Sequence, residues 1–302
     1  MNPTPIRPAQ TQDLPEICRL LASGARSFAN VGEGELSGLL QESFGAAVQV
    51  DSQNISGFVV LRQEDSIEEL SAHAPARVSL RAAATKYPGA KARRQFIALF
   101  ECAEETLPAW SAGQLFYAMT DQGWWKASLT EAGFKHHDSI RFYERSGPVA
   151  QPQHQPARLR PADRSDLPHL ARLDEAAFEP LWHMGVAELG RLYADCRLEV
   201  AVRDGQKAGY AALNLQNDGE ERDQKTAQLV RLAVHPHAQH LGIGRQLLIS
   251  SLLHAHAQGI CRVLLNTQES NRPSQRLYES LHFRKRGRAV PVYVKRKSIR
   301  RN

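Results

Sequence analysis

The stretch Leu232-Ala-Val-His-Pro-His-Ala-Gln-His-Leu-Gly-Ile-Gly-Arg-Gln-Leu-Leu248 decides the fold of the second half of the chain. It runs from a strand expected at 228–234, through a loop with two glycines, into a helix expected at 245–258. Glycines at spacing two before a helix let the backbone approach an anion closely. Because a helix N-terminus offers free N–H groups and the positive end of its dipole, the loop predicts a phosphate-binding cradle at 239–245.

The glycine pair alone is also typical of an ordinary tight turn. It is not a dinucleotide-binding GxGxxG, because no acidic ribose anchor follows, and not a P-loop, because no Gly-Lys-Ser/Thr follows. The order of the secondary-structure elements around this loop predicts the fold class. A hairpin is expected at 199–215 around the turn Asp204-Gly205, followed by strand, helix, strand at 262–267, helix at 273–281 and strand at 290–294. This order predicts an α/β fold with a mixed sheet, of the α+β kind, and a ligand site at the edge where the helices begin.

The opening of the chain recurs about 153 residues later. The segments 6–20 and 159–173 share Arg, Pro, Ala, Asp, Leu, Pro, Arg and Leu at matching positions. Between the copies, 147–156 is rich in proline and has no apolar periodicity, which predicts an extended linker. We therefore predict two tandem domains, 1–146 and 157–302, joined by the linker 147–156.

The stretch 232–248 resembles the acetyl-CoA motif of the GNAT superfamily of N-acetyltransferases, whose pattern is Arg/Gln-x-x-Gly-x-Gly/Ala. The segment Asn271–Phe283 resembles that family's second signature, Asn…Leu-Tyr-Glu-x-x-Gly-Phe, and the opening at 159 also fits, so the resemblance covers nearly all of 157–294. It implies two GNAT-like domains and acetyl transfer from acetyl-CoA, a co-substrate, to a small-molecule or peptide amine. The tandem layout with a degenerate first copy is similar to that of mycothiol synthases, although no motif in the sequence indicates that acceptor.

Carried over by position, the resemblance implies roles for individual residues. Backbone groups of Leu232, Ala233 and Val234 would bond the pantetheine arm as an added strand does. The pyrophosphate would lie on the backbone amides of Gln239, His240, Leu241, Gly242, Ile243, Gly244 and Arg245. Asn271 would touch the pantetheine arm, and Tyr278 would be the general acid, since a phenol offers a proton with a pKa not far above that of a thiol. The acceptor pocket is expected to use Phe178, Trp182 and His183, which fit the core equally well.

One departure concerns the base. Gln228 stands where many members carry a glutamate that accepts the amine proton, and glutamine cannot do so. Either His235, His237 or Glu269 takes that role, or the amine arrives deprotonated. The histidines at 235, 237 and 240 have no carboxylate or cysteine partner at ligand spacing, so we expect no metal. The missing glutamate also supports a second hypothesis, a non-catalytic CoA-binding or protein-interaction module.

The first copy lacks the residues that would do the chemistry. At the positions of Gly242, Gly244, Tyr278 and Asn271 it has Ala92, Arg94, Leu129 and Gln122. Side chains at both cradle positions should block a close backbone approach. We therefore expect residues 1–146 to keep the fold, to bind no CoA productively and to serve a structural role.

Composition and charge set the remaining expectations. Hydrophobic residues make up 42% and charged residues 23%, as in ordinary globular proteins. No apolar run approaches the roughly 18–20 residues of a membrane span, and the first residues lack the pattern of a signal peptide. We therefore expect a cytoplasmic protein without membrane partners. The net charge of +6 includes the basic segment 295–302, which we interpret as a solvated tail, not a nucleic-acid site, and no pattern indicates an oligomeric state.

Overall fold

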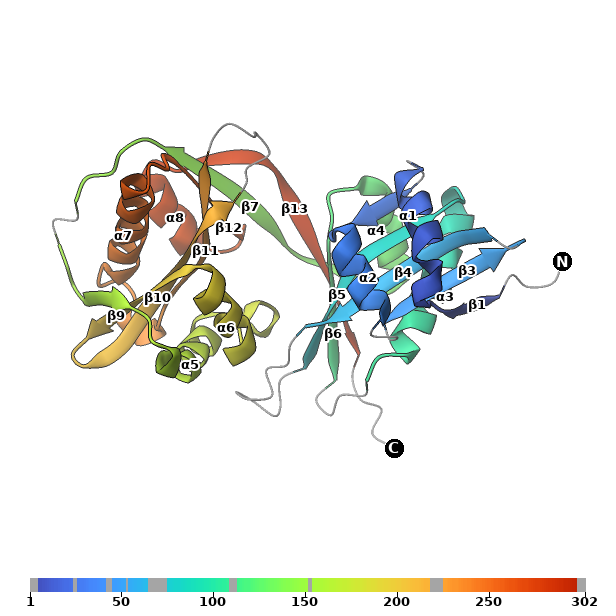
Figure 1. The fold of residues 1–302 in the computed structure, drawn as a ribbon, viewed down its shortest axis with the longest axis horizontal. Coiled ribbons are helices and arrows are strands. Elements are labelled where there is room, and N and C mark those ends of the chain that lie inside the picture. Colours follow the sequence, from blue (N-terminus) through green and yellow to red (C-terminus); the bar gives the residue numbers. More distant parts are fainter. Residues whose placement is uncertain are drawn as a thin grey trace. The chain divides into compact units, whose positions relative to one another are not determined.

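The computed structural model describes residues 5–23, 26–41, 45–52, 54–64, 75–108, 113–151, 154–217 and 225–297. Contacts divide the chain into two compact units (Figure 1). The first holds the described residues up to Asp138 together with 290–297, and the second holds Ser139–Ala289. Two strands belong partly to each unit, β7 (Lys135–Ser146) and β13 (Arg284–Lys297). The division of the chain into domains at 147–156 stays a prediction.

The sheet of the first unit has the strand order β1-β3-β4-β5-β6, followed by the last residues of β13. Its strands are β1 (Ile6–Pro8), β2 (Ser27–Ala29), β3 (Ala46–Asp51), β4 (Asn54–Gln63), β5 (Ala76–Thr85) and β6 (Gln114–Met119). β5 and β6 are parallel, and β2 pairs with β5 in the antiparallel sense. The sheet is therefore mixed, as the sequence predicts.

Four helices in the described part of the chain cover this sheet, two on each face. They are α1 (Leu14–Ala22), α2 (Glu33–Gln41), α3 (Gly89–Glu105) and α4 (Gly123–Glu131). Val48 and Phe58 pack with α1 and α2, whereas Val59 packs with α3 and α4. This follows from the twofold alternation of side chains along a strand, which gives the apolar strands one buried face on each side.

The second unit repeats this plan with the strand order β7-β12-β11-β10-β9-β8. Its strands are β8 (Arg158–Pro161), β9 (Arg197–Arg203), β10 (Gln206–Asn217), β11 (Thr226–Val234) and β12 (Arg262–Gln268). Its helices are α5 (Leu167–Ala177), α6 (Val186–Asp195), α7 (Ile243–Ala257) and α8 (Arg272–Ser280). The helices α5 and α6 pack on one face of the sheet and α7 and α8 on the other.

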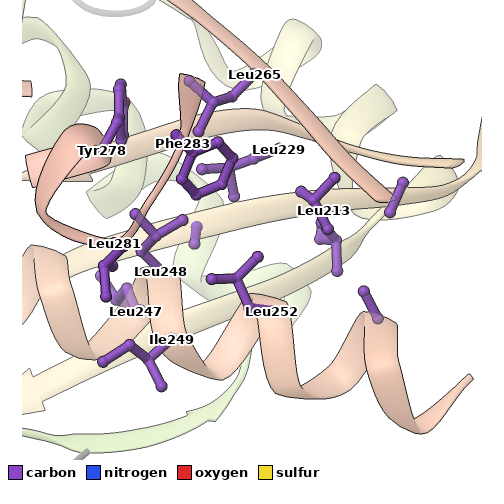
Figure 2. Close-up of a cluster of buried hydrophobic side chains, with 14 of the residues drawn as sticks. Leu213, Leu229, Leu247, Leu248, Ile249, Leu252, Leu265, Tyr278, Leu281 and Phe283 are labelled. Carbon is purple, nitrogen blue, oxygen red and sulfur yellow. The ribbon is translucent and has the colours of Figure 1, made fainter. Parts of the chain in front are cut away.

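The core beneath α7 and α8 is shown in Figure 2. Leu247, Leu248 and Leu252 of α7 face the sheet, where Leu213, Leu229 and Leu265 lie on three neighbouring strands. These helix positions are the apolar stripe with a period near 3.6 residues that the sequence shows. Tyr278, Leu281 and Phe283 close the other side of this core.

The predicted elements are present, with shifted ends. The hairpin turns at Asp204 (φ 49°) and Gly205 (φ 76°), a pair of positive φ values that favours Asp-Gly. Helix α7 begins two residues before the predicted start, at Ile243. The final strand is much longer than 290–294. Of the segment 295–302, which we interpret from the sequence as a solvated tail, Lys295–Lys297 pair with β6, and Glu104 forms ion pairs with Lys295 and Lys297; residues 298–302 lie outside the described residues.

The repeated opening has a physical cause. Arg7 forms a bidentate ion pair with Asp13 at 2.7 and 2.8 Å, and Arg160 forms the same pair with Asp166 at 2.7 and 2.9 Å. Each aspartate also accepts a backbone N–H three residues earlier. The shared Arg and Asp therefore fix the turn that connects the first strand of each copy to its first helix. Among the residues that the structure describes, no helix is long and apolar enough to cross a bilayer.

Candidate active site

The parallel strands β11 and β12 pair over only part of their length. Their register runs from Thr226↔Arg262 to Leu229↔Leu265. β11 then continues to Val234 alongside β10, and its register with β10 shifts at the same level, between Ala212 and Leu213. Such a bulge bends a strand, so the two parallel strands separate beyond Leu229. The edge of β11 at Leu232–Val234 thus faces a gap in the sheet.

A cavity of about 550 Å³ lies at this gap. Its described lining is Ala177, Phe178, Leu232, Ala233, Val234, Ala238, Gln239, His240, Gly242, Ile243, Gly244, Arg245, Asn271, Pro273, Ser274 and Leu277. The structure therefore brings together the residues that the sequence predicts for CoA, with one exception. Leu241 is 39% exposed and is not in the lining.

Two residues of the loop before α7 have a left-handed backbone conformation. Gly242 has φ +85° and His240 has φ +63°, and the Gln239 side-chain amide donates to the Val234 carbonyl at 3.1 Å. The two glycines differ in what they require. A side chain at Gly242 would be strained by its φ, whereas a Cβ at Gly244 would only make ordinary contacts, at 3.5 Å to Val234 and 3.6 Å to Leu277. The bare backbone at Gly244 therefore leaves room beside the helix N-terminus.

Tyr278 lies on α8, the helix that Asn271 caps by accepting a hydrogen bond from Ser274 N at 3.2 Å. Its ring is buried and meets the edge of the Tyr143 ring at a centroid distance of 5.9 Å. Burial raises the pKa of Tyr278 to about 12, against the opposing effects of a hydrogen bond with Ser274 and the charge of Arg231. Tyr278 is outside the described lining, but Ser274 belongs to it, so the phenol reaches the cavity wall through that hydroxyl.

Of the three residues predicted for the acceptor pocket, one lines the cavity and two do not. Phe178 lines the cavity. Trp182 does not, and its indole donates to Glu179 at 2.8 Å. His183 is buried, with Nε2 at 2.8 Å from the Phe178 carbonyl.

Sequence reasoning missed the arginine that organises this region. Arg231 on β11 donates to Asp174 at 2.8 and 2.6 Å and to the Trp182 carbonyl at 2.6 Å. Its guanidinium carbon is 3.6 Å from the centre of the Phe178 ring. Asp174 is fully buried and also accepts from the Tyr210 hydroxyl. A buried ion pair thus fixes the Phe178 wall of the cavity.

No carboxylate is among the described residues that line the cavity. Glu269 is hydrogen bonded to Arg141 at 2.6 Å, and His235 Nδ1 accepts from His237 N at 3.3 Å. None of these three candidate bases belongs to the described lining. In the part of the chain that the structure describes, no group of three or more His, Cys, Asp or Glu side chains is arranged to hold a metal ion.

The first copy fills the equivalent gap with its own chain. Ala82–Ala84 of β5 stand 150 residues before Leu232–Val234, and β2 pairs with them in the register Ser27↔Ala84, Phe28↔Ala83 and Ala29↔Ala82. The Phe28 side chain is buried against Trp125, at a ring distance of 6.4 Å. In the second copy the corresponding segment forms a short 3-10 helix, η3 (Pro180–Trp182), which leaves the β11 edge open to the cavity.

The cradle loop of the first copy is absent rather than blocked. Only residues 86–88 separate β5 from α3, whereas 235–242 separate β11 from α7. Ala92 and Arg94, which we expected to obstruct a loop, lie within α3. Leu129 occupies the place of Tyr278, since Leu129 O and Tyr278 O accept from Phe134 N and Phe283 N in the same way, at 2.9 and 3.0 Å.

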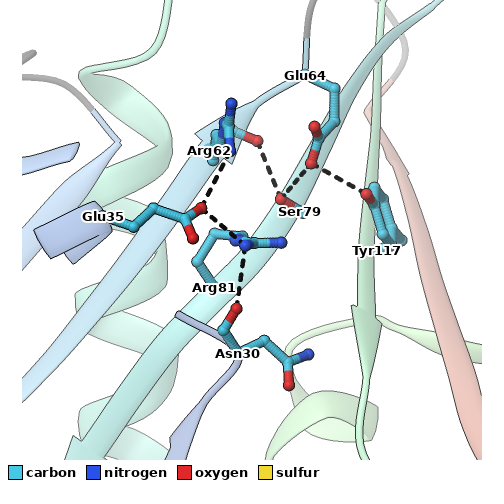
Figure 3. A network of polar contacts seen from close by, with 7 residues as sticks. All are labelled: Asn30, Glu35, Arg62, Glu64, Ser79, Arg81 and Tyr117. Atoms are coloured by element: carbon cyan, nitrogen blue, oxygen red, sulfur yellow. Dashed lines mark hydrogen bonds and ion pairs between the residues drawn. The ribbon is translucent and has the colours of Figure 1, made fainter. Parts of the chain in front are cut away.

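Arg81 in the first copy corresponds to Arg231. It donates to the Asn30 carbonyl at 3.0 Å and to Glu35 at 2.8 Å (Figure 3). Arg231 makes the matching bond to the Trp182 carbonyl. Each copy therefore uses an arginine at the same strand position to hold the segment after its first helix, a recurrence that aligning the two copies could have revealed.

Comparison with known proteins agrees with this picture. Residues 167–283 match the model of the acetyltransferase (GNAT) family. The solved GCN5-related N-acetyltransferase from Sphaerobacter thermophilus superposes on 98% of this chain and 96% of its own, with a TM-score of 0.61 at 14% identity. A tandem GNAT protein from the clavulanic acid biosynthesis pathway superposes on 97% of this chain and 98% of its own, with a TM-score of 0.60 at 15% identity. The chain thus has the fold of tandem GNAT proteins, and its residues 167–283 are similar to the acetyltransferase (GNAT) family.

Sequence relatives are mycothiol acetyltransferases. That of Thermomonospora curvata is 38% identical over 86 residues, which are 28% of this chain and 27% of the relative. That of Thermobispora bispora is 31% identical over 84 residues, 28% of each protein. The chain therefore matches about a quarter of the length of these curated relatives.

Proposed function

We propose that the second unit is an N-acetyltransferase that uses acetyl-CoA and has the only active site of the chain. The observation that carries the proposal is the separation of β11 from β12 beyond Leu229, at a cavity that ends on the N-terminus of α7. An open strand edge beside a helix N-terminus suits a ligand with an extended amide arm and a pyrophosphate.

The pantetheine arm would add to β11 at Leu232–Val234, as β2 adds to Ala82–Ala84 in the first copy. The pyrophosphate would accept hydrogen bonds from backbone amides between Gln239 and Arg245. Asn271 lines the same cavity while its side-chain oxygen caps α8, so its amide group would contact the arm from the opposite wall.

In the reaction, the amine nitrogen attacks the carbonyl carbon of the thioester and the carbon–sulfur bond breaks. Tyr278 would give its proton to the departing thiolate, with the Ser274 hydroxyl between the phenol and the cavity. With a pKa of about 12, Tyr278 is protonated at neutral pH, as an unperturbed tyrosine also is, and the raised pKa makes it a weaker acid toward the thiolate. Because no carboxylate is in the described lining, we infer that the amine enters neutral or loses its proton to water.

The first copy would bind no acyl-CoA, because β2 occupies the strand edge and the phosphate loop is missing. Its role would be structural. The acceptor would be a small-molecule or peptide amine, and the Phe178 wall held by Arg231 would contact it.

A panel of amines with acetyl-CoA and detection of free thiol tests this proposal, and the panel should include the acceptor of mycothiol acetyltransferases. We expect thiol release that depends on one amine and is lost in Tyr278→Phe. If no amine in a broad panel supports release although CoA binds, the transferase proposal is wrong.

The alternative, a non-catalytic CoA-binding or interaction module, is favoured by Gln228, which stands where many GNAT members have a glutamate. Tyr278→Phe separates the two functions. An enzyme should lose turnover while keeping its affinity for CoA. A binding module has no turnover to lose and should keep its affinity for CoA.

A further inference from the structure

The strand β7 brings a tyrosine of the first repeat into the second unit. Although β7 precedes the predicted linker in the sequence, its residues from Ser139 onward belong to the second unit. There β7 pairs with β12 in the register Leu265↔Tyr143. Tyr143 is buried in the core beneath α7 and α8. The core around Tyr278, the proposed acid, is therefore completed by a residue of the first repeat.

Tyr143 contacts one face of α8. Its ring packs edge to face with that of Tyr278, with the ring planes at 62° to each other. Its hydroxyl lies 3.2 Å from Glu279 Oε1 and 3.4 Å from Gln275 Oε1, and its single proton is donated to one of them at a time. Gln275, Tyr278 and Glu279 are three and four residues apart on α8, so they lie on the same side of the helix.

The Gln275 side chain links this contact to the end of β12. It is buried, and its amide nitrogen donates to the carbonyls of Gln268 at 3.2 Å and Glu269 at 2.7 Å. Gln268 is the last residue of β12 and lies beyond the last pair of β12 with β11. One amide therefore connects Tyr143, the end of β12 beside the gap in the sheet, and the helix that carries the proposed acid.

A second residue of β7 holds the other end of α8. The buried side chain of Arg145 donates from Nε to the carbonyl of Leu281 at 2.8 Å, and Leu281 follows directly after α8. Arg145 and Tyr143 lie on the same side of β7, because side chains alternate along a strand. β7 thus holds α8 at two points on either side of Tyr278.

The first copy lacks the counterparts of these side chains as well as the acid. At the spacing that puts Leu129 in the place of the acid, Lys126 and Thr130 stand in the places of Gln275 and Glu279. Both are exposed, and the Thr130 hydroxyl donates to the Lys126 carbonyl within α4 itself. The side chains that attach the helix to the sheet therefore occur in the copy that has a phenol to hold in place.

We propose that Tyr143 is a positioning residue for acyl transfer, which fixes α8 through its ring and through Gln275 so that the Tyr278 phenol reaches the cavity wall. The proposal rests on the proposed function, in which Tyr278 is the acid. A phenol gives its proton to a departing thiolate only within hydrogen-bond reach, so a small displacement of α8 slows this step. The last strand of the first repeat thereby serves the active site of the second.

Kinetics of the full chain with Tyr143→Phe test the assignment, because this change removes the hydroxyl and keeps the ring. We expect kcat to fall about tenfold with unchanged affinity for CoA. If Tyr143 acts through the acid, the same change made in the Tyr278→Phe background should lower kcat no further. Tyr293→Phe, at a buried tyrosine in the core of the first unit, is the matched control and should keep the wild-type kcat.

An unchanged kcat in Tyr143→Phe would overturn the assignment. An equal fall in kcat with and without Tyr278→Phe would also overturn it, because Tyr143 would then act independently of the acid.

A second measurement does not depend on acetyl transfer. In protein made with 3-fluorotyrosine, the fluorine NMR signal of Tyr278 is the one that is absent in Tyr278→Phe. We expect Tyr143→Phe to split or broaden this signal, as a phenol in more than one position would, and Tyr293→Phe to leave it sharp. If the signal responds but no amine is acetylated, Tyr143 holds the phenol and the transferase proposal fails. If an amine is acetylated but the signal stays single and sharp, the transferase stands and the positioning role fails.

Discussion

Replacing Arg231 with methionine removes one partner of an ion pair whose carboxylate is fully buried and whose arginine side chain is 11% exposed. Asp174 would lose two charge-assisted hydrogen bonds, and the Trp182 carbonyl would lose its bond to the guanidinium. Leaving a buried charge without its partner costs about 3–5 kcal/mol. Asp174 keeps the Tyr210 hydroxyl and the Met184 backbone N–H at 2.8 Å, so we expect the low end of that range, about 3 kcal/mol.

Urea unfolding monitored by circular dichroism measures this loss, with the transition of the second unit fitted separately if two transitions appear. Arg158→Met, at an exposed arginine on β8, is the matched control and should change stability by less than about 0.5 kcal/mol. Adding Asp174→Asn to Arg231→Met should recover part of the loss, because the unpaired charge is removed. A stability of Arg231→Met within about 1 kcal/mol of the wild type would refute the buried ion pair as the support of the Phe178 wall.

Three further predictions concern the acid, the cradle and the repeated ion pair. Tyr278→Phe should lower kcat by about 10²–10⁴ with unchanged affinity for CoA. Because a pKa of about 12 keeps the phenol protonated, a pH–rate profile of the wild type should show no loss of rate from this group below about pH 11. Gly242→Ala should destabilise the protein by about 1–2 kcal/mol because of its φ of +85°, and should weaken CoA binding. The control Gly190→Ala, in the middle of α6 with open space around it, should stabilise the protein by about 0.5–1 kcal/mol. Equal melting temperatures of the two variants would contradict this. Hydrogen bonds from Arg160 hold the pKa of Asp166 well below its usual range, so Asp166→Asn should lower the free energy of unfolding by about 1–3 kcal/mol at pH 7. This difference from the wild type should shrink as the pH falls below about 4 toward the folded pKa, and a difference independent of pH would argue against the ion pair.

The cradle and the repeat could be predicted because each depends on local chemistry. Gly242 needs no distant partner to adopt its positive φ, and the Arg160–Asp166 pair is closed within six residues. The helix α7 and the strands beside it likewise follow from apolar periodicity. Such features appear wherever the required residues occur at the required spacing.

The closure of the first copy could not be predicted, because it depends on contacts between distant residues. Ser27-Phe28-Ala29 is too short to show strand alternation, and its pairing with Ala82–Ala84 is determined by burial of Phe28 against Trp125. The same holds for Lys295–Lys297, whose charge indicates a solvated tail until β6 and Glu104 are placed beside them. Phe178, Trp182 and His183 look equivalent in the sequence, and the buried Arg231–Asp174 pair decides which of them faces the cavity.

A crystal structure of the full chain with acetyl-CoA tests the central claim most directly. We expect one molecule per chain, with its pyrophosphate on the amides at 239–245, its pantetheine arm beside Leu232–Val234 and the first copy still closed by β2. Acetyl-CoA bound at the β5 edge of the first copy, or two molecules per chain, would contradict a single site in the second copy.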